Sequence, residues 1–255
     1  MMSASAFQEL QNLLFFPIKG SNNRNRLLVA GIIGFVGFII PIIPGIFLLG
    51  YAGLIMQAII HENVDPSMPE WKDWSKMFAL GLKLGDAIFV YSLPALIVML
   101  LGYASMMLPA FLQIFSRPQS YSEVSPFTGI SFLGMFGSMA FFGIGLILFV
   151  PLLLLLPPIM SHVAANNSFS AAFHFKDWWK VLRSNIGGFA VTLVLSAGLY
   201  FLMIFVFQVL YMTIILCILI PFLLAFLIAY LTIIANVLFA MAYQEGSIRL
   251  SARES

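Results

Sequence analysis

Four long blocks without Lys, Arg, Asp or Glu constrain the fold of this chain more than any other feature. A helix needs about 20 apolar residues to cross the roughly 30 Å hydrocarbon core of a bilayer. Only 9% of the residues are charged, compared with about a quarter in soluble domains, so the chain lacks the polar groups that would cover its surface in water. The sequence therefore predicts an all-α membrane protein. The blocks are Leu27–Ile60, Ala87–Ser116, Val124–Phe175 (apolar up to about Met160) and Ser184–Gln244.

Prolines divide the first and the last block. Pro41 and Pro44 interrupt the first block, and Pro221 lies near the middle of the last; proline is unfavourable inside a helix because it removes a donor and clashes with the preceding turn. The two arms of the first block are only about 15 residues each, so spanning arms and a shallow re-entrant pair both remain open. We expect about six transmembrane or re-entrant segments arranged as three hairpins, at about 27–60, 87–160 and 184–244.

The distribution of basic residues predicts the orientation. Cytoplasmic loops collect Lys and Arg, and of the 12 basic residues only Arg117, in the loop Ser116–Gly129, falls on the side opposite to the others. Both termini are therefore expected in the cytoplasm, with the chain in the plasma membrane. No secretory signal peptide is evident. We expect an N-terminal interfacial segment over 1–26, with an amphipathic helix around Leu13, a single polytopic domain over 27–244 and a cytoplasmic tail over 245–255.

A repeated element precedes two of the segments. Trp71–Phe78 matches Phe175–Leu182 in its aromatic and basic positions. At about 100° per residue, the aromatic rings and the basic side chains of each copy fall on different faces, which is typical of a helix lying at the membrane surface. We expect such helices at about 67–85 and 168–183, the first starting at a capping box formed by Ser67 and Glu70. The predicted lipid head-group and interface residues are Trp71, Lys72, Trp74, Lys76, Lys83, Lys176, Trp178, Lys180 and Arg183.

Several of these motifs also identify a family. The run Pro69-Glu70-Trp71-Lys72-Asp73-Trp74, the segment Phe16-Pro17-Ile18-Lys19 before the first block, and Ser168-Phe169-Ser170-Ala171-Ala172-Phe173 before the second copy resemble the family of polytopic membrane proteins called domain of unknown function 4013. The resemblance covers nearly the whole chain. It implies a prokaryotic membrane protein without established chemistry.

Three polar residues lie within the apolar segments or at the edge of one. Asp86 follows Lys83 by three positions, which allows either a local ion pair or a proton or ion relay. Gln208 and Asn236 could line a polar path, although amides in membrane helices more often form interhelical hydrogen bonds. We treat Asp86, Gln208 and Asn236 as the candidate intramembrane polar site.

The remaining motifs indicate no chemistry. His61, His162 and His174 match no metal-ligand spacing, and the pair Gly81 and Gly85 favours close helix packing over nucleotide binding; the sequence predicts no metal, no cofactor, no catalytic residues and no nucleic-acid partner. The leading hypothesis is a non-enzymatic scaffold or accessory subunit that binds anionic lipid and either other membrane subunits or a second copy of itself. The alternative is a transporter or channel-like protein for a small molecule or lipid.

Overall fold

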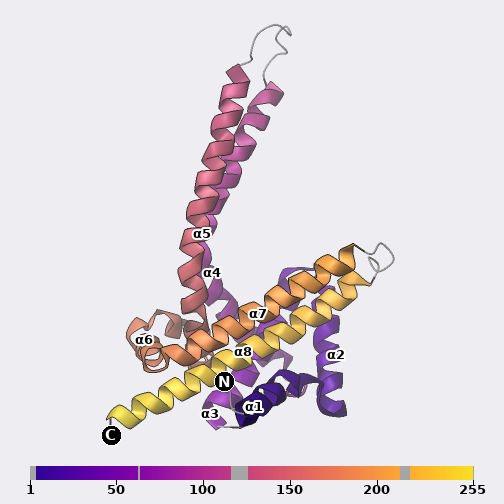
Figure 1. The fold of residues 1–255 in the computed structure, drawn as a ribbon, viewed down its shortest axis with the longest axis vertical. Coiled ribbons are helices and arrows are strands. Elements are labelled where there is room, and N and C mark those ends of the chain that lie inside the picture. Colours follow the sequence, from indigo (N-terminus) through magenta and orange to yellow (C-terminus); the bar gives the residue numbers. More distant parts are fainter. Residues whose placement is uncertain (1–3, 63, 116–125, 213–218, 255) are drawn as a thin grey trace. The chain divides into compact units, whose positions relative to one another are not determined.

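The computed structural model describes residues 4–62, 64–115, 126–212 and 219–254, and within these ranges all regular structure is helical (Figure 1). The chain forms two compact units, one from Met1–Ile88 with Leu156–Ser255 and one from Phe89–Leu155. Arg117 and the first part of its predicted loop lie outside the described residues. The elements are α1 (Ala4–Phe15), the 3-10 helix η1 (Phe16–Ile18), α2 (Gly20–Val36), α3 (Ile42–Glu62), α4 (Trp74–Phe115), α5 (Pro126–Asn166), the 3-10 helix η2 (Phe169–Phe173), α6 (Phe175–Ser184), α7 (Ile186–Tyr211) and α8 (Ile220–Glu254).

Five helices of the described chain are long and apolar enough to cross a membrane. Their outer faces carry large apolar side chains such as Phe201, which is 71% exposed, and Leu133, which is 74% exposed; apolar surface on this scale marks contact with lipid or protein rather than water. The predicted all-helical, multi-pass membrane class is confirmed at this level. The five spans are Ile42–Glu62, Trp74–Pro109, Ser131–Asn166, Ile186–Tyr211 and Ile220–Arg253.

The first of the six predicted segments is not among these five. It corresponds to α2, which begins with polar and basic residues including Arg24 and Arg26 and ends at Val36, so its apolar part covers only 27–36 and is too short to span a bilayer. Whether this part of the chain is re-entrant stays a prediction, as does the arrangement in three hairpins.

Two of the prolines that divide the first and last blocks lie at helix starts, where their ring fits the first turn. Pro44 is the third residue of α3, and Pro221 is the second residue of α8. Pro41 lies in the bend that separates α2 from α3.

Helix α8 is the centre of the first unit and packs against α2, α3, α6 and α7. Glycines allow the closest contacts: a Cβ on Gly31 would overlap the ring of Phe226, and a Cβ on Gly34 would lie 3.0 Å from the carbonyl oxygen of Ala225. Gly31, Gly34 and Gly81 therefore lie at helix contacts within this chain.

The second unit is a pair of antiparallel helices, formed by the later part of α4 and the earlier part of α5. Small residues again lie at the contact: Ser105 Oγ donates to the Gly134 carbonyl oxygen at 3.3 Å. Further along the same contact, a Cβ on Gly145 would lie 2.5 Å from Met99 Cγ.

The structure differs from the predicted helix start near Ser67, because α4 begins only at Trp74. The segment between them is held by tertiary contacts in place of helical hydrogen bonds. Met68 is 1% exposed, Arg26 donates to its carbonyl oxygen, and the Tyr51 hydroxyl donates to the next carbonyl at 2.8 Å. These contacts satisfy the backbone and outweigh the local capping signal.

Candidate functional site

Helix α6 carries an exposed group of basic side chains. Lys176, Lys180 and Arg183, here called the α6 basic stripe, are all exposed, and among the described residues none of them has an acidic partner within ion-pair distance. The Arg183 guanidinium lies 5.5 Å from the ring centroid of Trp179, which is 42% exposed. Basic groups and an aromatic ring thus share the open side of a short amphipathic helix.

The opposite side of α6 is buried in the protein. Trp178 is 3% exposed, and its Nε1 donates to the Ala172 carbonyl oxygen at 3.1 Å. The predicted lipid contact of Trp178 is therefore corrected: the ring belongs to the protein core, and its neighbour Trp179 is the exposed tryptophan. Two adjacent tryptophans lie about 100° apart on a helix, so only one of them can face the core.

Polar side chains at the end of α6 attach it to α8. Ser184 Oγ donates to the Gly246 carbonyl oxygen at 2.6 Å. Asn185 Nδ2 donates to the Ala242 carbonyl oxygen at 2.9 Å, while Asn185 Oδ1 accepts from the Gly188 N–H at 3.2 Å and so caps α7. The backbone of Asn185 is non-helical (φ −139°, ψ 45°), which separates α6 from α7.

The basic residues of the first repeat copy are paired, in contrast to the α6 basic stripe. Lys72 forms an ion pair with Glu70, Arg26 lies 3.4 Å from the same carboxylate, and Lys76 lies 3.4 Å from Asp73. The hydrogen bond from Lys72, together with its charge, lowers the pKa of Glu70 below its ordinary value. The two copies thus match in sequence but differ in the charge that they leave available.

The aromatic residues of the first copy also divide between the fold and the surface. Trp71 is half-buried and stacks on Tyr51 with ring centroids 3.9 Å apart, and its Nε1 donates to the Arg26 carbonyl oxygen at 2.9 Å. Trp74 is 44% exposed and contacts Phe47 edge-on at 5.5 Å. Of the two predicted interface tryptophans in this copy, Trp74 has the more open surface.

Lys83 connects α4 to the end of α5. Its Nζ donates to the backbone oxygen of Asn167 at 2.9 Å and to the side-chain oxygen of the same residue at 3.0 Å. Asn167 has φ 46°, the left-handed conformation that asparagine tolerates just after a helix. The predicted ion pair with Asp86 is not formed: Asp86 is exposed on α4, and no hydrogen bond or ion pair of its carboxylate is found within the described ranges.

Gln208 and Asn236 do not form a polar path with Asp86. Gln208 is exposed on α7, whereas Asn236 on α8 is 5% exposed and donates to Thr232, one turn earlier in the same helix, at 2.8 Å. The Oδ1 of Asn236 is buried and has no hydrogen-bond partner in the part of the chain that the structure describes. The expected interhelical hydrogen bond of this amide is therefore replaced by one within α8.

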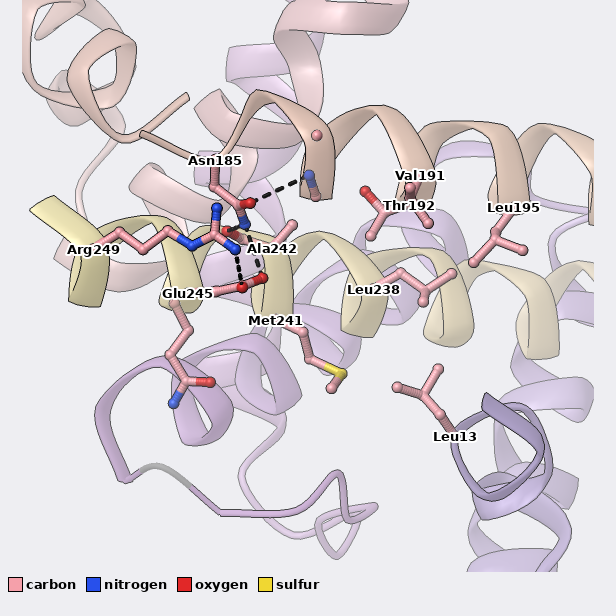
Figure 2. Close-up of a pocket in the computed structure, with 13 residues that line it drawn as sticks. Leu13, Asn185, Val191, Thr192, Leu195, Leu238, Met241, Ala242, Glu245 and Arg249 are labelled. Atoms are coloured by element: carbon pink, nitrogen blue, oxygen red, sulfur yellow. Dashed lines mark hydrogen bonds and ion pairs between the residues drawn. The ribbon is translucent and has the colours of Figure 1, made fainter. Parts of the chain in front are cut away.

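A pocket of about 520 Å³ lies between α1 and the facing surfaces of α7 and α8 (Figure 2). Most of its wall is apolar, including Leu13, Val191 and Leu238. At the polar end, the Glu245 carboxylate accepts from Asn185 at 3.1 Å and from Arg249 at 2.5 Å. Because Glu245 and Arg249 neutralise each other, the pocket suits the apolar chain of a lipid better than an ion. Asp86, Gln208 and Asn236 are not among its lining residues.

Two of the three histidines meet an acid that the sequence analysis had not grouped with them. The ligand atoms of His162, His174 and Asp177 lie within 4.8 Å of one another. His61 lies apart from this group, with Nε2 2.8 Å from the Ala165 carbonyl oxygen. The spacing of the three residues along the chain matches no motif, since the bend between α5 and α6 brings them together.

The long apolar helices, the exposed apolar faces and the paired amphipathic elements define a multi-pass helical membrane protein. The chain belongs to the family described as protein of unknown function (DUF4013), whose model matches residues 33–212. The family resemblance seen in the sequence is confirmed. No curated protein and no solved structure matches the chain.

Proposed function

We propose that this protein is a non-enzymatic integral membrane scaffold or accessory subunit that binds anionic lipid through the α6 basic stripe. The observation that carries the proposal is that Lys176, Lys180 and Arg183 are exposed and lack acidic partners among the described residues. The exposed ring of Trp179 lies beside them.

The contrast between the two repeat copies supports this assignment. A basic side chain near an anionic leaflet contributes about 1 kcal/mol of attraction, so three available charges contribute about 3 kcal/mol. Lys72 and Lys76 already neutralise nearby carboxylates, so their attraction for phosphate groups should be weaker. A tryptophan at the level of the head groups adds a favourable interfacial contact. We therefore assign head-group binding mainly to α6.

Binding to protein partners would have to use other surfaces than the glycine stripes. Gly31 and Gly34 contact α8, and Gly81 contacts α3, so these stripes are already covered within the chain. The exposed apolar faces, such as the side of α7 that carries Phe201 and Val194, remain available to lipid, to another membrane subunit or to a second copy. Binding to another membrane subunit or to a second copy through these faces is part of the proposal.

The experiment compares a triple variant of the α6 basic stripe with a double variant of the first repeat copy. Lys176→Gln, Lys180→Gln and Arg183→Gln are combined in one variant, and Lys72→Gln with Lys76→Gln in the control. Binding of phosphatidylglycerol and phosphatidylcholine to the detergent-solubilised protein is measured by native mass spectrometry and lipid titration.

The α6 variant should lose phosphatidylglycerol affinity by about 100-fold, from about 3 kcal/mol of lost attraction, with phosphatidylcholine binding unchanged. The control should lose much less. Equal losses in the two variants, or no preference of the wild-type protein for phosphatidylglycerol, would contradict the proposal.

The alternative hypothesis of a transporter or channel-like protein has less support. It expected a path joining Asp86, Gln208 and Asn236, but two of these are exposed and the third is buried with its amide bonded inside α8. The largely apolar pocket of Figure 2 favours binding of a lipid chain, which is compatible with a lipid-binding scaffold.

A further inference from the structure

We propose that His162, His174 and Asp177 form a binding site for a divalent transition-metal ion, with Zn²⁺ as the representative. His162 lies near the end of α5, His174 directly precedes α6, and Asp177 is in the first turn of α6. The three side chains each point one potential ligand atom into the same small region, with all these atoms within 4.8 Å of one another.

The spacing fits a site that closes slightly around an ion. Donor atoms in a tetrahedral zinc site are about 3.4 Å apart, given Zn–N and Zn–O bonds of about 2.0–2.1 Å. His174 and Asp177 are exposed, so small rotations of these two side chains can bring their donors closer. Among the described residues, no ion pair joins the Asp177 carboxylate to a basic side chain, so this carboxylate is available to an ion.

Tyr243 on α8 supplies an independent sign of a ligand arrangement. His162 is 7% exposed, and its Nδ1 lies 2.6 Å from the Tyr243 hydroxyl. Metal-binding histidines are typically oriented by such a hydrogen bond on the nitrogen that does not bind the metal. Asn166 Nδ2 lies 3.4 Å from both His162 Nδ1 and His162 Nε2, while its shorter bond, 2.9 Å, goes to the backbone oxygen of His162. The Nε2 of His162 is therefore the natural metal ligand.

A simple buried histidine explains part of this arrangement. It accounts for the hydrogen bond between His162 and Tyr243, but it does not account for the convergence of His174 and Asp177 on the same point. The positive end of α6 and the neighbouring Lys176 disfavour a cation there, and the carboxylate of Asp177 offsets this effect. Two imidazoles with one carboxylate favour zinc or a similar ion over Mg²⁺ and Ca²⁺, which prefer oxygen ligands alone.

A metal at this position would join three elements. It would connect the end of α5 to the start of α6 and, through Tyr243, would fix both relative to α8. The inference does not depend on lipid binding, because its ligands are separate from the α6 basic stripe. Loss of lipid binding and loss of metal binding are therefore measured in different experiments.

The experiment uses the full-length chain in detergent, with any affinity tag removed and bound metal stripped by a chelator. Zn²⁺ is titrated by calorimetry, and the bound metal is counted by elemental analysis after dialysis. Co²⁺ is added in parallel, because tetrahedral coordination gives visible absorption bands. The variants are His174→Ala, Asp177→Asn and Tyr243→Phe, and the matched control is His61→Ala, which removes a histidine outside the cluster.

The wild-type protein and the His61→Ala control should bind a single Zn²⁺ per chain. Removing a residue that orients a metal ligand lowers metal affinity by about 10- to 100-fold, so Tyr243→Phe should weaken Zn²⁺ binding by this factor. His174→Ala and Asp177→Asn each remove a ligand and should weaken it by at least as much. Equal melting temperatures of all variants in chelator would show that their folds are intact. Absence of Zn²⁺ binding, unchanged affinity in His174→Ala and Asp177→Asn, or an equal loss in His61→Ala would overturn the proposal.

Discussion

Replacing Gly81 by alanine tests the crossing of α3 and α4 directly. A Cβ at Gly81 would overlap the carbonyl oxygen of Ile46 and would lie 3.0 Å from the backbone nitrogen of Gly50. Both are backbone atoms, so no side-chain rotation can relieve the overlap, and the helices must separate. Gly85 lies one turn further along α4, where the nearest heavy atom to a Cβ is Leu49 Cδ2, at an ordinary contact distance of 3.9 Å.

The two alanine substitutions should have effects of opposite sign. Overpacking typically costs about 1–3 kcal/mol, and a backbone clash lies at the upper end of this range, at about 3 kcal/mol. Alanine in place of glycine inside a helix gains about 0.5–1 kcal/mol. We therefore expect Gly81→Ala to lower the free energy of unfolding by about 2 kcal/mol and Gly85→Ala to raise it by about 0.5–1 kcal/mol.

The assay is reversible unfolding of the detergent-solubilised protein by SDS, followed by tryptophan fluorescence. Trp71 and Trp74 lie beside the crossing and report its separation. The reasoning is refuted when Gly81→Ala unfolds within about 0.5 kcal/mol of the wild-type protein, or when Gly85→Ala loses as much stability as Gly81→Ala.

Three further substitutions test contacts in and next to the first repeat copy. Lys83→Met removes both hydrogen bonds to Asn167 and should lower the free energy of unfolding by about 1 kcal/mol. Lys76→Met removes an exposed ion pair and should change the free energy of unfolding by less than about 0.5 kcal/mol. The SDS unfolding midpoint measures both effects. Because Lys72 lowers the pKa of Glu70, the stability supplied by the Glu70 carboxylate is present above its unfolded pKa and is lost as the pH falls through the folded value. Glu70→Gln should therefore unfold with a shallower pH dependence than the wild-type protein as the pH falls below the ordinary pKa of glutamate, and identical profiles would contradict the role assigned to this pair.

The membrane class could be predicted because it depends on summed properties of the sequence. Charge-free blocks of membrane length and the prolines that interrupt the first and last blocks are visible without any tertiary information. The start of α4 could not be predicted, since the capping pattern at Ser67 competes with the burial of Met68, a contact that only the fold creates. The sequence likewise gives no means of deciding which of Trp178 and Trp179 faces the core.

The roles of individual polar residues and glycines were also beyond the sequence. Gly81 and Gly85 look equivalent in a GxxxG pattern, yet only Gly81 touches the backbone of another helix. The grouping of His162 with His174 and Asp177 depends on the bend after α5, for which the sequence offers only Asn167 as a local sign. The difference in ion pairing between the two repeat copies could not be predicted either, because the lysines of both copies have the same periodicity.

The non-helical backbone at Asn185 gives the two repeat copies different mechanical properties. The first copy leads into α4 without a break, so the segment around Trp74 moves together with the first turns of α4. The second copy ends at the non-helical Asn185, whose side chain bonds to α8 and also caps α7. A displacement of α6 would therefore be resisted by its hydrogen bonds to α8 and would reach α7 through the buried Asn185.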